Sequence, residues 1–318
     1  MYSIIVPVYK NADSLPELLT EIDGVAAQLD GPLEVVFVID GSPDASYALL
    51  KEALPLRPWR GRLICHSRNF GSFAATRTGL ERASGPYFSR WAADLQEPPE
   101  LMCDFFRALR QGECDVAVGQ RRKRDDPGAS RLFSYLYWSF YRRWVVRDIP
   151  EGGADAFACN KKVRDALIRL SERNTSLIGL LFWLGFRRKF VPYDRRPRRY
   201  GKSAWSFSRK LRYMFDSVYS FTDLPIAVLT FVGAAGVVIS VLFSILAFAA
   251  WALGMISVAG YTPTVLLISF FGALNMFGLG IIGAYVWRAF ENTKMRPQSV
   301  VFSDEEFAEA KKELAASS

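Results

Sequence analysis

The feature that most limits how this chain can fold is a long stretch without any charged side chain. No Asp, Glu, Lys or Arg occurs from Leu224 to Trp287. The loop-like sequence 254–263 divides this stretch into two apolar segments, 225–253 and 264–287. Each is longer than the roughly 20 residues that a helix needs to cross a bilayer. A hairpin buried in a soluble protein would need a core around both helices, so we predict two transmembrane helices.

Basic residues flank the outer ends of this stretch, whereas the connecting loop carries no charge. They precede it at 209–212 and follow it at Arg288 and Lys294. Because the cytoplasmic flanks of transmembrane helices are enriched in Lys and Arg, both termini are expected in the cytoplasm. This makes the chain a multi-pass protein of the inner (plasma) membrane. In the cytosolic tail, 288–318, the sequence Ser303–Glu306 matches a capping box and predicts a short helix.

Small residues recur on both apolar segments. They suit close packing of helices within the chain or between copies, so a homo-oligomer is expected. These residues are Gly233, Ala234, Gly236, Gly278, Gly280 and Gly283.

The remaining sequence is basic. The chain of 318 residues has a net charge of +8, which suits anionic lipid headgroups or phosphate-bearing substrates. Nucleic acid is a competing partner, but no nucleic-acid module is recognisable and the basic residues lie beside aromatic segments. The four cysteines show no metal-type spacing and read as reduced cytosolic thiols. His66, the single histidine, cannot form a zinc site by itself and reads as a strand-end residue.

The N-terminal half alternates between short β-branched runs and helical patterns. Strands are predicted at 3–8, 33–39, 62–66, 87–91 and 115–118, and helices at 15–29, 45–54, 74–83 and 99–110. This alternation predicts an α/β fold with a mostly parallel sheet, which binds ligands at the carboxyl ends of its strands. The segments expected at that edge are Pro7–Tyr9, Asp40, Arg68, Asn69 and Asp94.

Two further segments, 130–146 and 204–223, combine aromatic with basic residues. This composition favours helices that lie in the headgroup layer of a membrane, and aromatic core helices are the alternative. The expected organisation is therefore a catalytic domain that includes the first such helix, an amphipathic helix, two transmembrane helices and a tail. Their limits are 1–203, 204–223, 224–287 and 288–318.

Two acids at the predicted edge suit a nucleotide site. Asp40 can accept hydrogen bonds from a base or ribose, and Gly41 allows the backbone to come close, although ordinary turns use the same residues. Asp94 is a candidate ligand for Mg²⁺ or Mn²⁺ beside a diphosphate, although an acid before a helix that begins with proline is common. The sequence has no P-loop, GxGxxG or nucleophile elbow, which argues against kinases, dehydrogenases and serine hydrolases.

Six short sequences, taken in order, make the interpretation specific. They are IIVPVY at 4–9, VIDGSPD at 38–44, SRNFG at 67–71, ADLQEPPE at 93–100, WLGF at 183–186 and RYGKS at 199–203. This set resembles the family 2 glycosyltransferases with the GT-A fold. Within that family it is most similar to the polyprenyl-phosphate glycosyltransferases, such as dolichol-phosphate mannose synthase and the bacterial undecaprenyl-phosphate sugar synthases. The resemblance covers nearly the whole chain.

The resemblance implies transfer of a sugar, expected from a UDP-sugar, to a polyprenyl (undecaprenyl-type) phosphate with inversion. The nucleotide would be held by Pro7, Tyr9, Asp40, Gly41 and Asn69. Asp94 and Asp155 would be catalytic, with Asp94 and Gln96 at the Mg²⁺ or Mn²⁺ ion and Asp155 acting on the acceptor. The diphosphate and lipid phosphate would be bound by Arg121, Arg131, Ser134, Arg198, Arg199 and Lys202.

Three positions depart from the family pattern. Ile39 replaces the first acid of DDGS, and Ala156-Phe157 replaces the usual Phe-Arg after Asp155. Ala92 replaces the first acid of D-x-D, which should weaken binding of a divalent metal. These changes keep open a non-catalytic membrane scaffold or nucleotide sensor with a degenerate transferase domain. A processive polysaccharide synthase is a further alternative, but the chain lacks that class's longer membrane channel and QxxRW-type segment.

Overall fold

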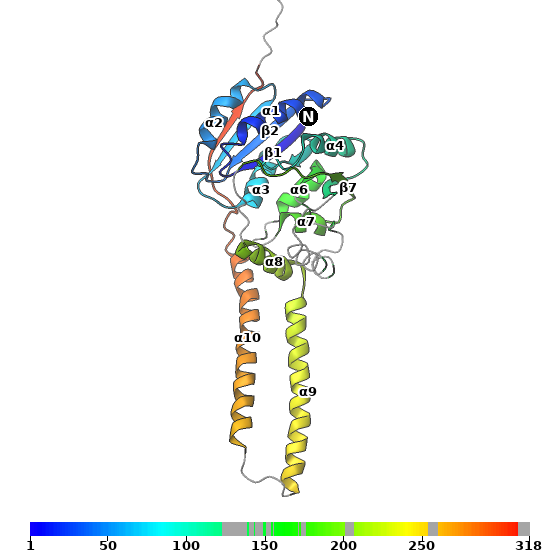
Figure 1. Cartoon of the computed structure of the whole chain (residues 1–318), viewed down its shortest axis with the longest axis vertical. Helices are drawn as coiled ribbons and strands as arrows, with labels where there is room; N and C mark the ends of the chain where they lie inside the picture. The colour runs from blue at the N-terminus through cyan, green and yellow to red at the C-terminus, as the bar shows by residue number, and fades with distance from the viewer. Residues whose placement is uncertain are drawn as a thin grey trace, which may run out of the picture. The chain divides into compact units, whose positions relative to one another are not determined.

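The computed structural model describes most of the chain. The described residues are 1–122, 139, 143, 149–150, 154, 156–170, 172, 176–200, 207–253 and 260–310. The chain divides into two compact units, and the first combines Met1–Lys210 with Arg296–Ser318. The second unit is Leu211–Met295 (Figure 1).

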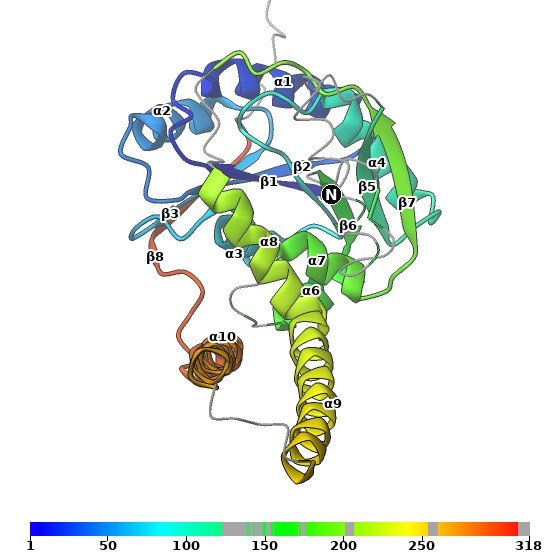
Figure 2. The same ribbon diagram turned by 60° about the horizontal axis from the view of Figure 1, so that its bottom comes forward.

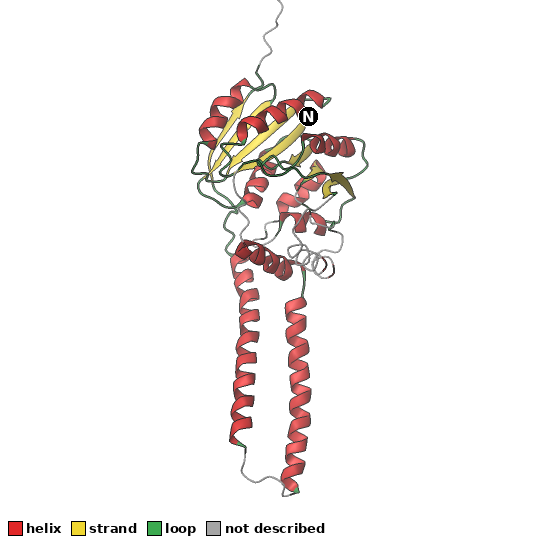
Figure 3. Ribbon diagram, viewed as in Figure 1, coloured by secondary structure: helices red, strands yellow, loops and turns green. Residues whose placement is uncertain are grey.

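An eight-stranded sheet, counted over the described residues, forms the centre of the first unit (Figure 3). The strands follow the order β7-β5-β6-β4-β1-β2-β3-β8. β1 pairs in parallel with β2 and β4, and β3 continues in parallel from β2. β6 is antiparallel to β4 and β5, and β8 is antiparallel to β3. The strands are β1 (Tyr2–Val8), β2 (Leu33–Ile39), β3 (Arg60–His66), β4 (Tyr87–Arg90), β5 (Val116–Arg121), β6 (Phe157–Asn160), β7 (Arg188–Tyr193) and β8 (Val301–Phe307).

Helices cover both faces of the sheet (Figure 2). One face carries α1 (Leu15–Gln28), α2 (Ser46–Ala53) and α4 (Pro99–Arg110), and the other carries α3 (Ser72–Arg82), α6 (Lys161–Arg169) and α7 (Leu177–Trp183). A short 3₁₀ helix, η1 (Leu54–Leu56), follows α2. Every residue of β2 is buried, as the apolar run 35–39 predicts for a strand that is covered on both sides. The α/β fold with a mostly parallel sheet is therefore confirmed.

Glycine permits the close approach of α3 to the sheet. A Cβ added at Gly79 would lie 2.3 Å from Cγ2 of Ile5, closer than any van der Waals contact allows. Only a residue without a side chain fits between α3 and β1 at this point. This packing sets the distance between α3 and β1.

The prediction of a helix at Ser303–Glu306 is wrong, because these residues belong to strand β8. Side chains along β8 alternate between partly buried and exposed, which is the period of a strand. Arg62 of β3 contacts Asp304 at 2.7 Å, and Lys51 contacts Glu305 at 3.0 Å. The unpaired edge of β3 and these basic side chains outweighed the local capping pattern.

The second unit contains long apolar helices. Its helices are α8 (Phe207–Phe221, which begins in the first unit), α9 (Leu224–Ala252) and α10 (Tyr261–Thr293). Over the described residues, Phe270–Thr293 is by itself long and apolar enough to cross a membrane. Met214–Phe221 and Leu224–Gly236 pass the same test together, across a bend of 76°. Both predicted apolar segments are thus helical, and one contains a candidate span.

Contacts within the second unit join α8 and α9 to α10. Arg288 of α10 donates to Asp216 of α8 at 2.6 Å. A Cβ added at Gly278 would lie 3.2 Å from Leu229, so this glycine serves packing between α9 and α10. Among the described residues, a Cβ added at Gly233 or Gly280 would meet no atom within 4 Å. The predicted interfacial helix at 130–146 lies outside the described residues, apart from positions 139 and 143.

Candidate active site

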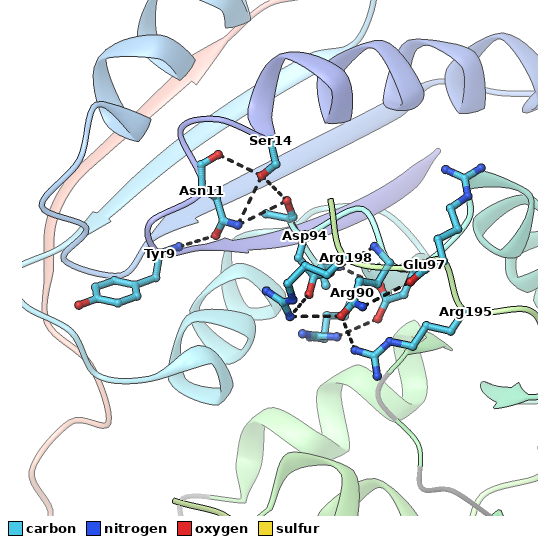
Figure 4. A network of polar contacts seen from close by, with 12 residues as sticks. Tyr9, Asn11, Ser14, Arg90, Asp94, Glu97, Arg195 and Arg198 are labelled. Atoms are coloured by element: carbon cyan, nitrogen blue, oxygen red, sulfur yellow. Dashed lines mark hydrogen bonds and ion pairs between the residues drawn. The ribbon is translucent and has the colours of Figure 1, made fainter. Parts of the chain in front are cut away.

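Three loops meet at the carboxyl edge of the sheet and are joined by hydrogen bonds. After β1, the backbone N–H of Lys10 donates to Ser42 Oγ of the loop after β2, at 2.8 Å. From the same β1 loop, Ser14 Oγ donates to the carbonyl of Ala93, which follows β4, at 2.7 Å (Figure 4). Loops that are far apart in the sequence are therefore held together at one edge, as the strand pattern predicted.

Asp40 lies at the centre of this edge and is almost fully buried, with 2% of its surface exposed. Its carboxylate accepts hydrogen bonds from the backbone N–H of Phe70 at 2.8 Å and of Gly71 at 2.7 Å. A third partner is Nδ1 of His66, 2.9 Å from Oδ1. The carboxylate thus holds the loop after β3 against the end of β2.

Gly41 and Asn69 complete this contact between loops. Gly41 has φ of +58°, and an added Cβ would lie 2.4 Å from the carbonyl carbon of Arg68. Asn69 Nδ2 donates to the backbone carbonyl of Asp40 at 3.2 Å. We call the group Asp40, Gly41, His66 and Arg68–Gly71 the Asp40 clamp. The structure brings together three of the residues predicted to bind a nucleotide, and a side chain at position 41 would separate the two loops.

Asp94 and Gln96 form a second group at the same edge. Leu95 between them has φ of +57°, a conformation that is uncommon for residues other than glycine. With this sharp turn, the side chains of Asp94 and Gln96 both reach the guanidinium of Arg198. Arg198 Nη2 donates to Asp94 Oδ2 at 2.6 Å and to Gln96 Oε1 at 3.2 Å. The two oxygens predicted as metal ligands therefore converge on a single positively charged nitrogen.

The cation comes from an extended segment after β7, residues 194–200, which we call the arginine segment. The backbone of Arg196 donates to the carbonyl of Gln96 at 3.0 Å, and Gln96 Nε2 donates back to Arg196 at 3.3 Å. Arg195 donates to Gln96 Oε1 at 2.5 Å (Figure 4). The backbone contacts hold the segment against the loop after β4 and place two guanidinium groups beside Gln96.

Glu97 is a buried acid in the same loop, with 4% of its surface exposed. It accepts a hydrogen bond from the backbone N–H of Ala92 at 2.9 Å and lies 3.4 Å from Nη1 of Arg90. Burial raises the pKa of Glu97, and the charge of Arg90 offsets part of that rise. Ala92, which replaces an acid of the family pattern, therefore lies next to the Glu97 carboxylate, which already has two donors. The Glu97 carboxylate stabilises the turn that carries Asp94.

Comparisons with known proteins identify the family to which the chain belongs. Residues 3–167, more than half of the 318-residue chain, match the family described as glycosyl transferase family 2. The chain is also 31% identical over 299 residues to the undecaprenyl-phosphate 4-deoxy-4-formamido-L-arabinose transferase of Pseudomonas fluorescens, covering 93% of this chain and 87% of that protein.

The chain belongs to glycosyl transferase family 2.

This glycosyltransferase has other full-length relatives. It is 30% identical over 300 residues to an uncharacterized glycosyltransferase of Synechocystis, covering 94% of each chain. Among solved structures, it is similar to glucosyl-3-phosphoglycerate synthase of Mycobacterium tuberculosis in complex with Mn²⁺, UDP-glucose and phosphoglyceric acid. That likeness has a TM-score of 0.48 and 16% identity over 68% of this chain and 79% of that one. It is too distant to bear on the site.

The remaining predicted site residues of the glycosyltransferase are distributed as follows. Pro7 and Tyr9 lie at the end of β1 and beyond it, and Tyr9 is 38% exposed. Arg121 lies at the end of β5, where it hydrogen-bonds Tyr193 of β7. Arg199 donates to Glu17 of α1 at 2.5 Å. Four predicted residues lie outside the described part of the chain: Arg131, Ser134, Asp155 and Lys202.

The residues of the glycosyltransferase fit a divalent cation only if the substrate supplies most of the ligands. No group of three or more His, Cys, Asp or Glu side chains gathers anywhere in the described ranges. However, the oxygens of Asp94 and Gln96 already share one cationic nitrogen, so they can hold one positive charge in common. Mg²⁺ on a nucleotide commonly takes one or two carboxylates together with phosphate oxygens and water. Asp94 with Gln96 meets this smaller requirement.

Sequence reasoning missed several residues of this edge, among them Arg195 beside Gln96, Glu97 and His66. Glu97 lies inside one of the family sequences, but its contact with Ala92 depends on a turn that the sequence does not reveal. His66 was read as an ordinary strand-end residue, yet its side chain is fully buried against Asp40. Its position after a predicted strand, at the ligand-binding edge of the sheet, was the available signal.

Proposed function

We propose that this glycosyltransferase transfers a sugar from a UDP-sugar to an undecaprenyl-type phosphate at the cytosolic face of a membrane, with inversion. The observation that carries the proposal is the convergence of Asp94, Gln96, Arg195 and Arg198 at the loop edge of the sheet. An anionic diphosphate leaving group needs such a concentration of positive charge and hydrogen-bond donors. Relatives that align over 93% of the chain and are named undecaprenyl-phosphate transferases support the acceptor class.

In this proposal the nucleoside lies between the end of β1 and the Asp40 clamp. The phenol of Tyr9 is exposed there and offers an aromatic surface to a base, with Pro7 beside it. The carboxylate of Asp40 is already bonded by three groups within the protein. Its contribution is therefore mainly to hold the backbone of Gly41 and the side chain of Asn69 in place for the base and ribose.

The diphosphate would replace Asp94 as the partner of Arg198. A phosphate oxygen and a carboxylate oxygen make the same type of charge-assisted hydrogen bond with a guanidinium, so this exchange keeps the arginine paired. Asp94, with Gln96, would then hold the divalent ion, Mg²⁺ or Mn²⁺, whose role would be to neutralise charge on the leaving diphosphate. Arg121, Arg199 and Lys202 are proposed, from the family resemblance, to bind the same phosphates or the lipid phosphate.

The acceptor would arrive from the membrane. Side chains of α9 and α10 are exposed although they are apolar, including Phe231 at 75%, Leu246 at 68% and Ile268 at 68%. Such surfaces are stable in lipid and not in water. We propose that 225–253 and 264–287 form two membrane spans of an inner-membrane protein with both termini in the cytoplasm, and that two copies pack through Gly233 and Gly280. Arg131, Ser134 and Asp155 are assigned to the acceptor by resemblance.

The chemistry needs little from a general base. A lipid phosphate is already anionic near pH 7, so its oxygen can attack the anomeric carbon as the bond to the diphosphate breaks. One such displacement inverts the configuration at that carbon. The protein contributes orientation of the two substrates and stabilisation of negative charge on the departing nucleotide. NMR of the lipid-linked product would reveal its anomeric configuration, and retention would contradict a single displacement.

The decisive test compares Asp94→Asn with Asp104→Asn. The full-length protein is incubated with undecaprenyl phosphate and a panel of radiolabelled UDP-sugars, and lipid-linked product is measured. We expect Asp94→Asn to lose about 100-fold or more of the turnover, because the divalent cation that would neutralise the leaving diphosphate loses its carboxylate ligand. Asp104 is an exposed acid of α4 paired with Arg107, and its variant should keep full activity. Circular dichroism should show that both variants fold.

Ala92, which replaces an acid of the family pattern, favours a second candidate function, that of a nucleotide sensor or scaffold without catalysis. The same experiment separates the two. A sensor would bind nucleotide and yield no lipid-linked product with any donor, in the unaltered protein as well as in the variant. This outcome would end the proposal of transfer to undecaprenyl phosphate.

A further inference from the structure

We propose that the C-terminal segment is part of the nucleotide site, because a chain of hydrogen bonds, buried from Asp40 to Thr78 and part-buried at Ser299, links it to Asp40. The chain consists of Asp40, His66, Thr78 and Ser299, and we call it the Asp40 relay. It makes His66, Thr78 and Ser299 positioning residues, which act through Asp40 and do not touch the substrate. The inference rests on the proposed function, since it assumes that the Asp40 clamp binds the nucleotide.

The geometry of the Asp40 relay is continuous. Nδ1 of His66 lies 2.9 Å from Oδ1 of Asp40, and Nε2 lies 3.0 Å from Oγ1 of Thr78. Oγ1 of Thr78 lies 2.8 Å from Oγ of Ser299. Each distance is within hydrogen-bond range, so four residues from four parts of the sequence form one chain.

One direction of donation satisfies every member of the chain. An ionised Asp40 carboxylate only accepts, so Nδ1 of His66 carries the proton between them. In a neutral imidazole Nε2 then accepts from the hydroxyl of Thr78, whose oxygen in turn accepts from the hydroxyl of Ser299. Each of these polar groups has a partner, and loss of the Thr78 hydroxyl leaves Nε2 of the buried His66 without the partner it has here.

Burial restricts the side chains of the relay to one position. The exposed fraction is 2% for Asp40, 2% for His66 and 3% for Thr78. Phe70 packs edge-on against the ring of His66, with centroids 5.5 Å apart, so the imidazole is held from a second side. The position of Asp40 in turn sets the backbone of Phe70 and Gly71. A shift at Thr78 is thus transmitted to the loop that forms the Asp40 clamp.

The C-terminal strand sets the position of Ser299. Two residues after Ser299, β8 begins its antiparallel pairing with β3, where Val301 faces His66 at a bulge between Cys65 and His66. The backbone N–H of Ser67 donates to the carbonyl of Val300 at 2.9 Å. The segment that follows α10 in the sequence therefore ends against the same residue that supports Asp40.

The helix α3 offers a matched pair of variants. Thr78→Val removes the relay hydroxyl and keeps the side-chain shape. Thr76 is equally buried on α3, but its hydroxyl donates to the carbonyl of Ser72 at 2.8 Å and takes no part in the relay. Thr76→Val is therefore the control for loss of a buried hydroxyl, and Thr78→Ser is the conservative rescue. On the C-terminal segment, Ser303→Ala is the control for Ser299→Ala, because it removes a buried hydroxyl oxygen that has no hydrogen-bond partner among the described residues.

The experiment measures binding of UDP, GDP, CDP and ADP to the full-length protein by calorimetry, and then donor KM and kcat for the nucleotide that binds best. We expect Thr78→Val, which removes two hydrogen bonds of the relay, and Ser299→Ala, which removes one, each to weaken binding of the nucleotide by about 10-fold or more. Donor KM should rise in proportion while kcat stays nearly unchanged. Thr76→Val and Ser303→Ala should bind as the unaltered protein does, and Thr78→Ser should restore binding.

Three results would count against the inference in different ways. If the unaltered protein binds nucleotide and Thr78→Val matches Thr76→Val in affinity and donor KM, the relay has no positioning role and the proposed function stands. If the unaltered protein binds none of the four nucleotides, the proposed function fails and the inference fails with it. A loss of affinity that Thr78→Ser does not restore would also overturn it, because the hydroxyl would then not be the cause.

Discussion

Removal of the Arg198 guanidinium should have opposite effects on the two ligands of the site. In the structure Arg198 neutralises Asp94 and also contacts Gln96. The guanidinium therefore competes with any metal cation for these oxygens, but it would bind a diphosphate when the donor is present. Arg198→Ala should strengthen binding of free Mn²⁺ and weaken binding of the nucleotide.

The size of the first effect follows from the contact that is lost. The side chains of Arg198 and Asp94 are 29% and 17% exposed, so solvent screens their attraction only in part. A charge-assisted hydrogen bond at 2.6 Å in such a setting contributes about 1–2 kcal/mol. A metal ion that no longer displaces the arginine gains this amount, which is about a 5- to 30-fold increase in affinity. The nucleotide should lose about 10- to 100-fold, because one contact to a diphosphate disappears.

Water-proton relaxation with Mn²⁺, which detects weak binding, would measure the first effect in the absence of nucleotide. Arg196→Ala is the control. It removes the same charge from the arginine segment, but the side chain of Arg196 pairs with Glu21 of α1. Asp94→Asn should abolish the gain when it is combined with Arg198→Ala. Equal Mn²⁺ affinity in the two arginine variants would refute the reasoning, since general charge would then explain the change. Unchanged nucleotide affinity in Arg198→Ala would refute the second half.

Two further predictions concern stability. Burial raises the pKa of Asp44, but hydrogen bonds from Ser42 and from neighbouring backbone and side-chain groups outweigh it and lower the pKa below 3.8. Asp44→Asn should therefore cost about 1 kcal/mol in free energy of unfolding at pH 7, and the difference should vanish as the pH falls through the depressed pKa, as measured by denaturant titration. Gly79→Ala should cost about 1–3 kcal/mol from overpacking against Ile5, while Gly24→Ala, with open space around it, should be neutral or stabilising in thermal melts.

The prediction of fold class succeeded because it depended on local pattern. Alternation of β-branched runs with helical periods located β1 to β5 and α1 to α4, and α4 begins and ends at the predicted residues. The position of Asp40, Asn69 and Asp94 at one edge was predictable to the same extent, since they follow strands whose carboxyl ends share that edge. The sequence did not contain the partners of these side chains. Arg198 lies far from Asp94 along the chain and reaches it only because the arginine segment hydrogen-bonds Gln96.

The sequence by itself determined the family, the order of the main elements and the presence of two long apolar helices. Helices and apolar runs are encoded by neighbouring residues, whose hydrogen bonds and hydrophobicity are local. Only the tertiary structure decided that Ser303–Glu306 is a strand, because a strand forms when a distant edge supplies its hydrogen-bond partners. The same applies to His66, which became a support for Asp40 through a buried contact between two strands and a helix.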